Sequence, residues 1–175
     1  SEMGIRARFN ACNLAFIPKG DDPHDGRLVA RTPATTRPIS QSNTDNKFFA
    51  LAINRPLAEA ARVTVHPRQR GFVQSRSLVD NVLEVEGYGQ SYTIAEGDNP
   101  AILLFVLMAA FPSLSHQWLF VVLRKMRVPK RILRALGALY KDCFATILLG
   151  GGRWNRISVL SGIRQGYPAS GSLFA

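Results

Sequence analysis

Residues 101–113 read AILLFVLMAAFPS, and the apolar run inside them decides what kind of fold this chain can adopt. Eleven apolar residues, 101–111, follow one another in a chain whose formal net charge is +10. A membrane-spanning helix needs about 20 such residues, and Pro112 and Ser113 end this run far short of that length. Residues 101–107 are rich in β-formers and apolar at every position, as in a central strand covered on both faces. The run therefore predicts a buried strand.

The length and composition fit one globular domain or part of a larger one. The chain has 175 residues, and a hydrophobic content of 46% is enough for a packed core. Cys12 and Cys143 match no zinc or redox spacing, and the N-terminus has no secretory segment, so we expect an intracellular protein with reduced thiols. The sequence begins without Met and stops at GSLFA, inside an expected helix. We therefore expect a fragment.

The positive charge is concentrated in the last part of the chain. From Val121 to Ala175 there are ten Lys or Arg residues and a single acid, Asp142, which gives +9 and leaves +1 for the first 120 residues. A basic surface of this density attracts polyanions because it releases their counterions. An ordinary solvated helix face is the alternative, but acids normally intersperse such a face. The charge pattern favours nucleic acid as a partner.

The first hundred residues predict loops followed by helices. Residues 18–46 hold four prolines and many small polar residues, which is typical of loops around short extended pieces. The apolar spacing over residues 47–63 predicts one or two helical segments, with Pro56 at a break or in a new first turn. Ser77 is suited to cap a further helix that ends near Gly87.

After the apolar run, the sequence predicts two helices, a hairpin and a glycine-rich loop. Ser113 or Ser115 can cap the first helix, and Pro129 suits the first turn of the second. The bases of both helices would point outward. The β-rich runs on either side of the glycines at 150–152 predict a hairpin. Residues 161–175 form a glycine-rich loop that leads into a helix.

Four stretches, in this order and spacing, resemble the reverse transcriptases of non-LTR retrotransposons. They are TRPISQSNTDNK (36–47), QRGFVQSRSLVDN (69–81), LLFVLMAAFPS (103–113) and SGIRQGYPASGSLF (161–174). The resemblance covers nearly the whole chain from about Asn13. It implies an α+β fold: the fingers and part of the palm of a right-hand polymerase, truncated before the catalytic Asp-Asp hairpin. A fingers-like region would occupy residues 1–100. A partial palm, with strand, two helices, hairpin and GIRQG loop, would occupy residues 101–175.

The resemblance also implies a reaction, RNA-directed DNA synthesis from deoxynucleoside triphosphates. Two Mg²⁺ ions held by carboxylates activate the primer 3′-hydroxyl and stabilise the leaving pyrophosphate. In the family, the first Asp lies four residues before an Ala-Phe pair; here that pair is Ala110-Phe111, and Val106 stands at the Asp position. Valine has no lone pair for a metal, and no Asp or Glu occurs from residue 99 to 141. We therefore expect a catalytically inactive chain that does not bind the magnesium of its family.

Other family roles map onto matching residues of this chain. Two fingers cations would hold the triphosphate, because Arg can engage a phosphate bidentately. An aromatic side chain would lie under the incoming sugar, and an amide in the GIRQG loop (162–166) would contact template and base pair. The expected nucleotide-binding residues are Lys19, Arg37, Phe111 and Gln165. The alternatives are solvated loop charges for Lys19 and Arg37, core packing for Phe111, and a generic glycine-rich turn for the loop that holds Gln165.

A second set is expected to contact nucleic acid. Bases of the fingers segment would touch template phosphates, and glycines of the loop would permit close backbone approach. The set is Arg70, Arg76, Gly162, Arg164 and Gly166, with a generic glycine-rich turn as the alternative for the loop. Tyr167, Ala169 and Gly171 depart from the family pattern, which indicates relaxed constraint there.

The partners implied are an RNA template, an RNA/DNA duplex and deoxynucleoside triphosphates, with no membrane. Three other interpretations stay open. The chain could be a non-catalytic, basic nucleic-acid-binding module built on residues 121–141. It could be a translated relic without a stable fold, since an incomplete palm sheet exposes an apolar edge. It could also be an unrelated α+β fold in which Val106 is ordinary core. Hydrolase and ATPase motifs are absent from the sequence.

Overall fold

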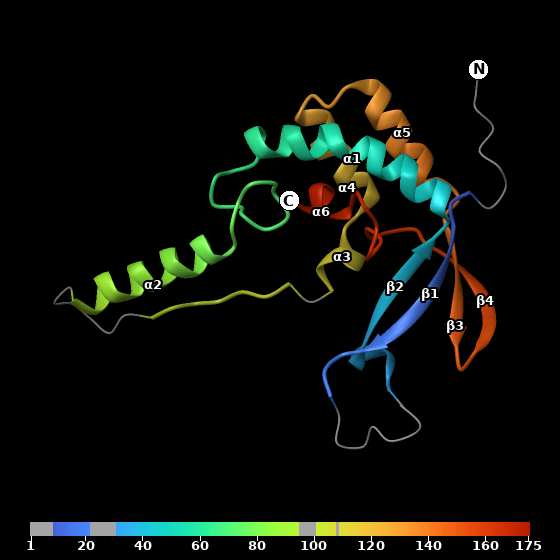
Figure 1. The fold of residues 1–175 in the computed structure, drawn as a ribbon, viewed down its shortest axis with the longest axis horizontal. Coiled ribbons are helices and arrows are strands. Elements are labelled where there is room, and N and C mark those ends of the chain that lie inside the picture. The colour runs from blue at the N-terminus through green and yellow to red at the C-terminus, as the bar shows by residue number, and fades with distance from the viewer. Residues whose placement is uncertain (1–8, 22–30, 95–100, 108) are drawn as a thin grey trace.

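The computed structural model describes residues 9–21, 31–94, 101–107 and 109–175. Within these ranges the fold is mixed α/β, with one four-stranded sheet and six helices (Figure 1). The strands are β1 (Ala11–Pro18), β2 (Thr36–Ser42), β3 (Phe144–Leu149) and β4 (Gly152–Ser158). The helices are α1 (Thr44–Thr64), α2 (Val79–Ile94), α3 (Ala110–Ser113), α4 (His116–Lys125), α5 (Lys130–Tyr140) and α6 (Ser170–Phe174), and a 3-10 turn covers Pro33–Thr35.

The sheet has the order β2-β1-β3-β4 and joins strands from both ends of the sequence. β1 pairs antiparallel with β2 and parallel with β3, and β3 and β4 form the predicted antiparallel hairpin. Gly150 and Gly151 have φ of 58° and 77° in its turn, a conformation that glycine adopts without strain. One sheet therefore unites the regions expected to be fingers-like and palm, and the boundary between them stays a prediction.

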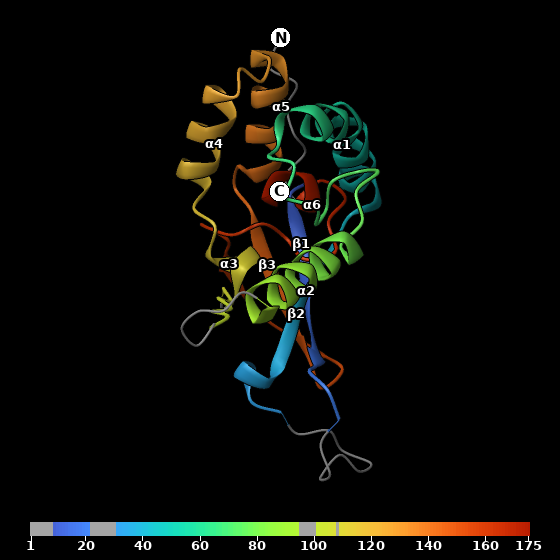
Figure 2. The ribbon, with the colours of Figure 1, turned by 90° about the vertical axis from the view of Figure 1, so that its left-hand side faces the viewer.

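The hydrophobic core lies among α1, α4, α5, α6 and the loop before α6, at one end of the sheet (Figures 1 and 2). Leu136 of α5 is 1% exposed and Ala50 of α1 is fully buried. Each fully buried Leu contributes roughly 1.5–3 kcal/mol to folding. The outer faces of α4 and α5 are exposed, as predicted, and carry the bases of this region.

Several local predictions are confirmed. The helix predicted over residues 47–63 is present as the single helix α1. The expected role of Pro56 is wrong, because it marks neither a break nor a first turn: it lies inside α1, on an exposed face where water can satisfy the freed carbonyl. The Ser115 hydroxyl accepts a hydrogen bond from the Trp118 N–H at 3.3 Å and caps α4. Pro129 immediately precedes α5 as its N-cap residue. The loop predicted over residues 18–46 contains β2 as a short extended piece, and part of it lies outside the described residues.

The predicted end of the helix near Gly87 is wrong, although its predicted start is confirmed. The Ser77 hydroxyl accepts from the Val79 N–H at 3.2 Å. The helix then continues through Gly87 and Gly89 to Ile94, because an isolated glycine costs a helix only about 1 kcal/mol. α2 projects from the core and has no buried residue among those described (Figure 1).

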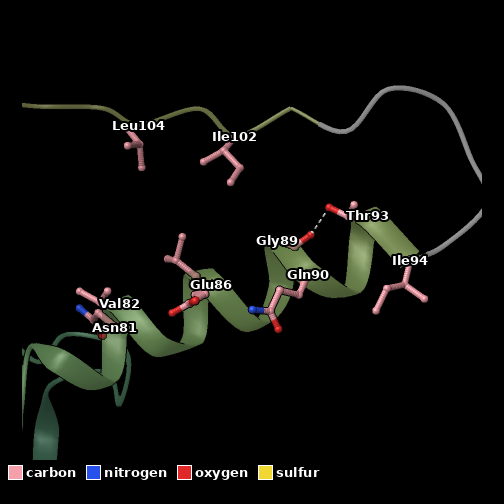
Figure 3. A pocket seen from close by; sticks show the side chains of 10 residues that line it. Asn81, Val82, Glu86, Gly89, Gln90, Thr93, Ile94, Ile102 and Leu104 are labelled. Carbon is pink, nitrogen blue, oxygen red and sulfur yellow. Dashed lines mark hydrogen bonds between the residues drawn. The ribbon is translucent and has the colours of Figure 1, made fainter.

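The prediction of a buried central strand at residues 101–107 is also wrong in this structure. The segment is extended but joins no sheet, and Phe105 and Val106 are 92% and 91% exposed. A strand needs a paired neighbour for its backbone groups, and the described part of the chain offers this segment none. It runs beside α2 instead, and Ile102 and Leu104 face the helix across an open groove of about 850 Å³ (Figure 3). No helix in the described ranges is long and apolar enough to span a membrane.

Candidate nucleotide and nucleic-acid site

The GIRQG loop, residues 162–166, connects the end of the apolar run to the outer edge of the sheet. The Gly162 and Ile163 N–H groups donate to the carbonyls of Leu114 and Phe111, at 2.7 and 2.8 Å. On the other side, the Gln165 carbonyl accepts from the N–H of Ser40 on β2 at 3.3 Å. The loop is thus held by backbone bonds on both flanks, and the Gln165 side chain is partly exposed between them.

Gly162 is required by packing as well as by conformation. Its φ is 81°, and a Cβ at this position would lie 2.6 Å from the Pro112 carbonyl oxygen. The same glycine's carbonyl lies 2.7 Å from Nε2 of His116, so that ring nitrogen must carry a proton and donate. Gly162 is buried, whereas Gly166, with φ of 78°, is exposed at the loop surface. Of the two, only Gly166 is placed for approach by a ligand.

Arg164 is a structural residue in this fold. Its side chain is turned inward and the residue is 4% exposed. The guanidinium donates to the carbonyls of Asn10 and Leu139 and to the side chains of Ser42, Asn46 and Cys143. The expected contact of Arg164 with nucleic acid is therefore not available in this geometry, because a buried charge uses its donors on protein acceptors.

The cluster around Arg164 is polar but contains no carboxylate partner among the described contacts. Asn46 Oδ1 accepts from Arg164 at 3.3 Å and from the Tyr167 hydroxyl at 2.6 Å. Burial raises the pKa of Tyr167 to about 12 and also raises the pKa of the Cys143 thiol, and in both cases Arg164 opposes the rise. The phenol and thiol are thus neutral at physiological pH. Neutral dipoles and the faces of two tyrosine rings hold the buried guanidinium of Arg164, whose carbon lies 5.1 Å from the ring centroid of Tyr167 and 6.0 Å from that of Tyr140.

Arg70 and Arg76 also spend their donors inside the molecule. Arg76 donates to the carbonyls at the end of α1 and in the loop that follows, those of Arg62, Val65, His66 and Gln69. Arg70 forms an ion pair with Glu84 at 2.7 Å and donates to Asn81. The two bases expected to contact template phosphates instead bind helices α1 and α2 to the intervening loop. The sequence could not distinguish a phosphate contact from an internal structural contact, because both roles use an Arg beside a helix.

Lys19 and Arg37 lie together at the far end of the β1–β2 pair. Arg37 pairs with Ile17 across the ladder. The Lys19 N–H continues the pairing with the Thr35 carbonyl at 2.9 Å, which places Lys19 diagonally from Arg37. Both residues are exposed, and the Lys19 ammonium donates to the Ala34 carbonyl at 2.9 Å. Of the expected nucleotide-binding residues, these two are brought side by side.

Phe111 belongs to a group of three aromatic rings. It stacks on Phe174 of α6 with ring centroids 4.8 Å apart and meets Phe72 edge-on at 5.5 Å. Phe72 approaches so closely that a Cβ on Gly171 would lie 3.1 Å from its ring. The departure from the family pattern at Gly171 thus serves packing, and Tyr167 and Ala169 are buried as well.

Comparison with known proteins identifies the family of this chain. Residues 17–175 match the family model described as reverse transcriptase (RNA-dependent DNA polymerase). The chain belongs to the reverse transcriptase family. A curated relative, the transposon TX1 uncharacterized 149 kDa protein of Xenopus laevis, is 27% identical over 165 residues. That alignment covers 93% of this chain and 12% of the relative's length. The recognition made from the four sequence stretches is confirmed.

The reverse transcriptase family generally uses divalent metal. Val106, at the expected Asp position, presents hydrocarbon and is exposed. Within the described ranges no three His, Cys, Asp or Glu side chains gather in a group that could hold a metal ion. Mg²⁺ prefers hard oxygen ligands, which valine does not supply.

Proposed function

We propose that this chain is the fingers (1–100) and partial palm (101–175) of a non-LTR retrotransposon reverse transcriptase. In this role it contacts nucleotide, RNA template and RNA/DNA duplex but does not itself catalyse polymerisation. The match over residues 17–175 supports the parent activity. The observation that carries the loss of catalysis is the exposed apolar segment around Val106, which stands where the family has a metal-binding Asp.

The nucleotide contacts are assigned to the sheet edge and the loop beside it. Lys19 and Arg37 supply two neighbouring cations, which suits a triphosphate with several negative charges. Gln165 reaches the same strand through the Ser40–Gln165 backbone bond, so the loop amide and Arg37 share β2. Phe111, held by Phe72 and Phe174, lies on the other flank of the loop, where it would supply an apolar contact for the sugar. Gly166 leaves the loop surface open to a base pair.

Binding of a fluorescent deoxynucleoside triphosphate, followed by anisotropy without added metal, tests the assignment. The double variant Lys19→Ala/Arg37→Ala should weaken binding by at least about tenfold, since each lost phosphate contact of this type is worth roughly 1 kcal/mol or more. A matched control, Arg55→Ala/Arg153→Ala, removes two exposed bases from α1 and β4 and should leave binding close to that of the parent. Equal losses in both variants would refute the assigned site.

Primer extension tests the second half of the proposal. With Mg²⁺, an RNA template and all four deoxynucleoside triphosphates, the 175-residue chain should add no nucleotide. Incorporation above that of a heat-denatured sample would overturn the inactive assignment.

A further inference from the structure

The surface formed by the α4–α5 turn and the outer face of α5 carries seven exposed bases, which we name the α4–α5 basic surface. They are Arg124, Lys125, Arg127, Lys130, Arg131, Arg134 and Lys141. The sequence holds no acid between residues 99 and 141. The apolar side of α5 is turned inward, with Leu136 and Leu139 buried, so the exposed side is almost entirely basic.

This charge is not neutralised within the described parts of the chain. The ion pairs there use Glu59 and Glu84, and neither acid pairs with a base of the α4–α5 basic surface. Lys130 and Arg131 even occupy the first turn of α5, which has no acid. The helix dipole favours negative charge at that end. Folding alone does not explain cations at this position, whereas an external polyanion would.

An exposed aromatic side chain accompanies the bases. Trp118 on α4 is 62% exposed, and Val121 one turn later is 39% exposed. Lys125 follows on the same side of the helix, seven residues after Trp118. An exposed indole two helical turns from a cluster of cations suits a single strand, because an unpaired nucleobase can stack on the ring while the backbone is held electrostatically. Paired bases in a duplex keep their faces covered.

The α4–α5 basic surface lies away from the proposed nucleotide contacts. In both views the α4–α5 turn is at one end of the molecule, and the start of β2, which carries Arg37, is near the other (Figures 1 and 2). The Lys and Arg side chains of the turn therefore cannot contact a triphosphate bound at Lys19 and Arg37. They require a ligand of their own.

We propose that the α4–α5 basic surface binds single-stranded nucleic acid. The Trp118 ring would stack on an unpaired nucleobase, and the Lys and Arg side chains of the turn would contact the phosphates. The site is separate from the nucleotide contacts and does not depend on the proposed function. An anionic membrane fits less well, because the apolar side of α5 is packed in the core and cannot enter a bilayer. A duplex fits less well because Trp118 would find no free base.

Anisotropy titrations with labelled oligonucleotides test this surface. The probes are a single-stranded RNA, a single-stranded DNA of the same sequence, the corresponding RNA duplex, and vesicles of anionic phospholipid. The parent should bind either single strand at least about tenfold more tightly than the duplex, since stacking is worth roughly 1–3 kcal/mol per base. Arg131→Gln/Arg134→Gln should weaken binding and lower the salt slope by about 1.4, or roughly 0.7 per lost contact.

Two matched controls separate this surface from general charge attraction. Arg55→Gln/Arg153→Gln removes the same charge from exposed sites on α1 and β4 and should change the slope far less. Trp118→Ala should weaken single-strand binding, whereas Trp154→Ala, at a residue 61% exposed on β4, should not. The proposal is overturned if the two double variants behave alike, if Trp118→Ala has no effect, or if duplex or vesicles bind best.

Discussion

At the residue scale, Arg164 illustrates how one motif residue can serve the fold instead of the ligand. The family resemblance placed it in a loop that touches nucleic acid, yet its guanidinium bonds to β2, α1 and α5 through Ser42, Asn46 and Leu139. A planar group with five donors can bind acceptors on several elements at once. Sequence alone gives the identity of a basic residue but not the direction of its side chain. The GIRQG motif was therefore recognised, but the structural role of Arg164 was not.

The phenol of Tyr167 gives a pH prediction for this buried cluster. Its pKa is raised from 10.0 to about 12, chiefly by burial. Since the folded-state pKa lies above the unfolded one, the neutral phenol contributes stability that is complete below pH 10 and is lost as the pH rises toward 12. Urea unfolding across that range should give a falling free energy. Tyr167→Phe should make the fall shallower, because Phe has no proton to lose.

Tyr92→Phe is the control for that measurement, since Tyr92 is 66% exposed on α2. It should leave the pH dependence of the parent intact. Some decline will persist in Tyr167→Phe, because burial also raises the pKa of Tyr140 and of the thiols of Cys12 and Cys143. Parallel curves for Tyr167→Phe and the parent would contradict the assignment.

At the element scale, the helices were predictable where a local signal marks their ends. Ser77 and Ser115 each accept a hydrogen bond from an N–H of the first turn, as their positions predicted. The glycines of α2 led to the wrong predicted end, because a glycine ends a helix only where the chain adopts a different conformation after it. β1 was not predicted, since its residues ACNLAFIP neither alternate cleanly nor form an apolar run. The segment is a strand because it pairs with β2 and β3, and this long-range pairing cannot be read from the sequence of the segment itself.

The C-terminal end of α1 depends on Arg76, and this gives a second prediction. Four carbonyls in and after the last turn accept from its guanidinium. Arg76→Ala should lower the free energy of unfolding by about 1–3 kcal/mol, because four carbonyls, two of them in partly buried hydrogen bonds, lose a charged donor. Hydrogen exchange at the Val65 amide, which bonds to the Ala61 carbonyl, should become faster.

Arg68→Ala provides the comparison for Arg76. Arg68 lies in the same loop, but its side chain is 68% exposed and contacts side chains, Glu84 at 3.4 Å and the Tyr88 hydroxyl at 3.3 Å. Exposed ion pairs contribute about 0–1 kcal/mol. A loss of stability in Arg68→Ala as large as that in Arg76→Ala would show that the loop, not the capping of α1, is the sensitive feature.

At the scale of the whole molecule, the sequence predicted the family, most of the helices and the hairpin, but not the order of strands in the sheet, and it misplaced the segment quoted first. An apolar run of β-formers indicates that its residues are suited to burial, but it does not identify the element against which they pack. Here the described sheet has its edges at β2 and β4, and neither pairs with residues 101–107. The GIRQG loop still bonds to Phe111, the last residue of the run, and to Leu114 just after it, so these contacts of the loop do not require residues 101–107 to form a strand.

This exposed apolar surface yields the last prediction. Residues 101–107 and the facing side of α2 form a contiguous patch in which most large side chains are more than half exposed, and patches of this kind mark interaction or aggregation sites. The chain should therefore bind a fluorescent apolar dye and self-associate with rising concentration. Leu103→Ser/Phe105→Ser should remove most of both effects, whereas Leu160→Ser, at an isolated leucine 83% exposed, should remove little. Dye fluorescence and sedimentation measure the two effects. An unchanged dye signal in Leu103→Ser/Phe105→Ser would mean that the segment is covered in solution, as a strand of a palm sheet would be.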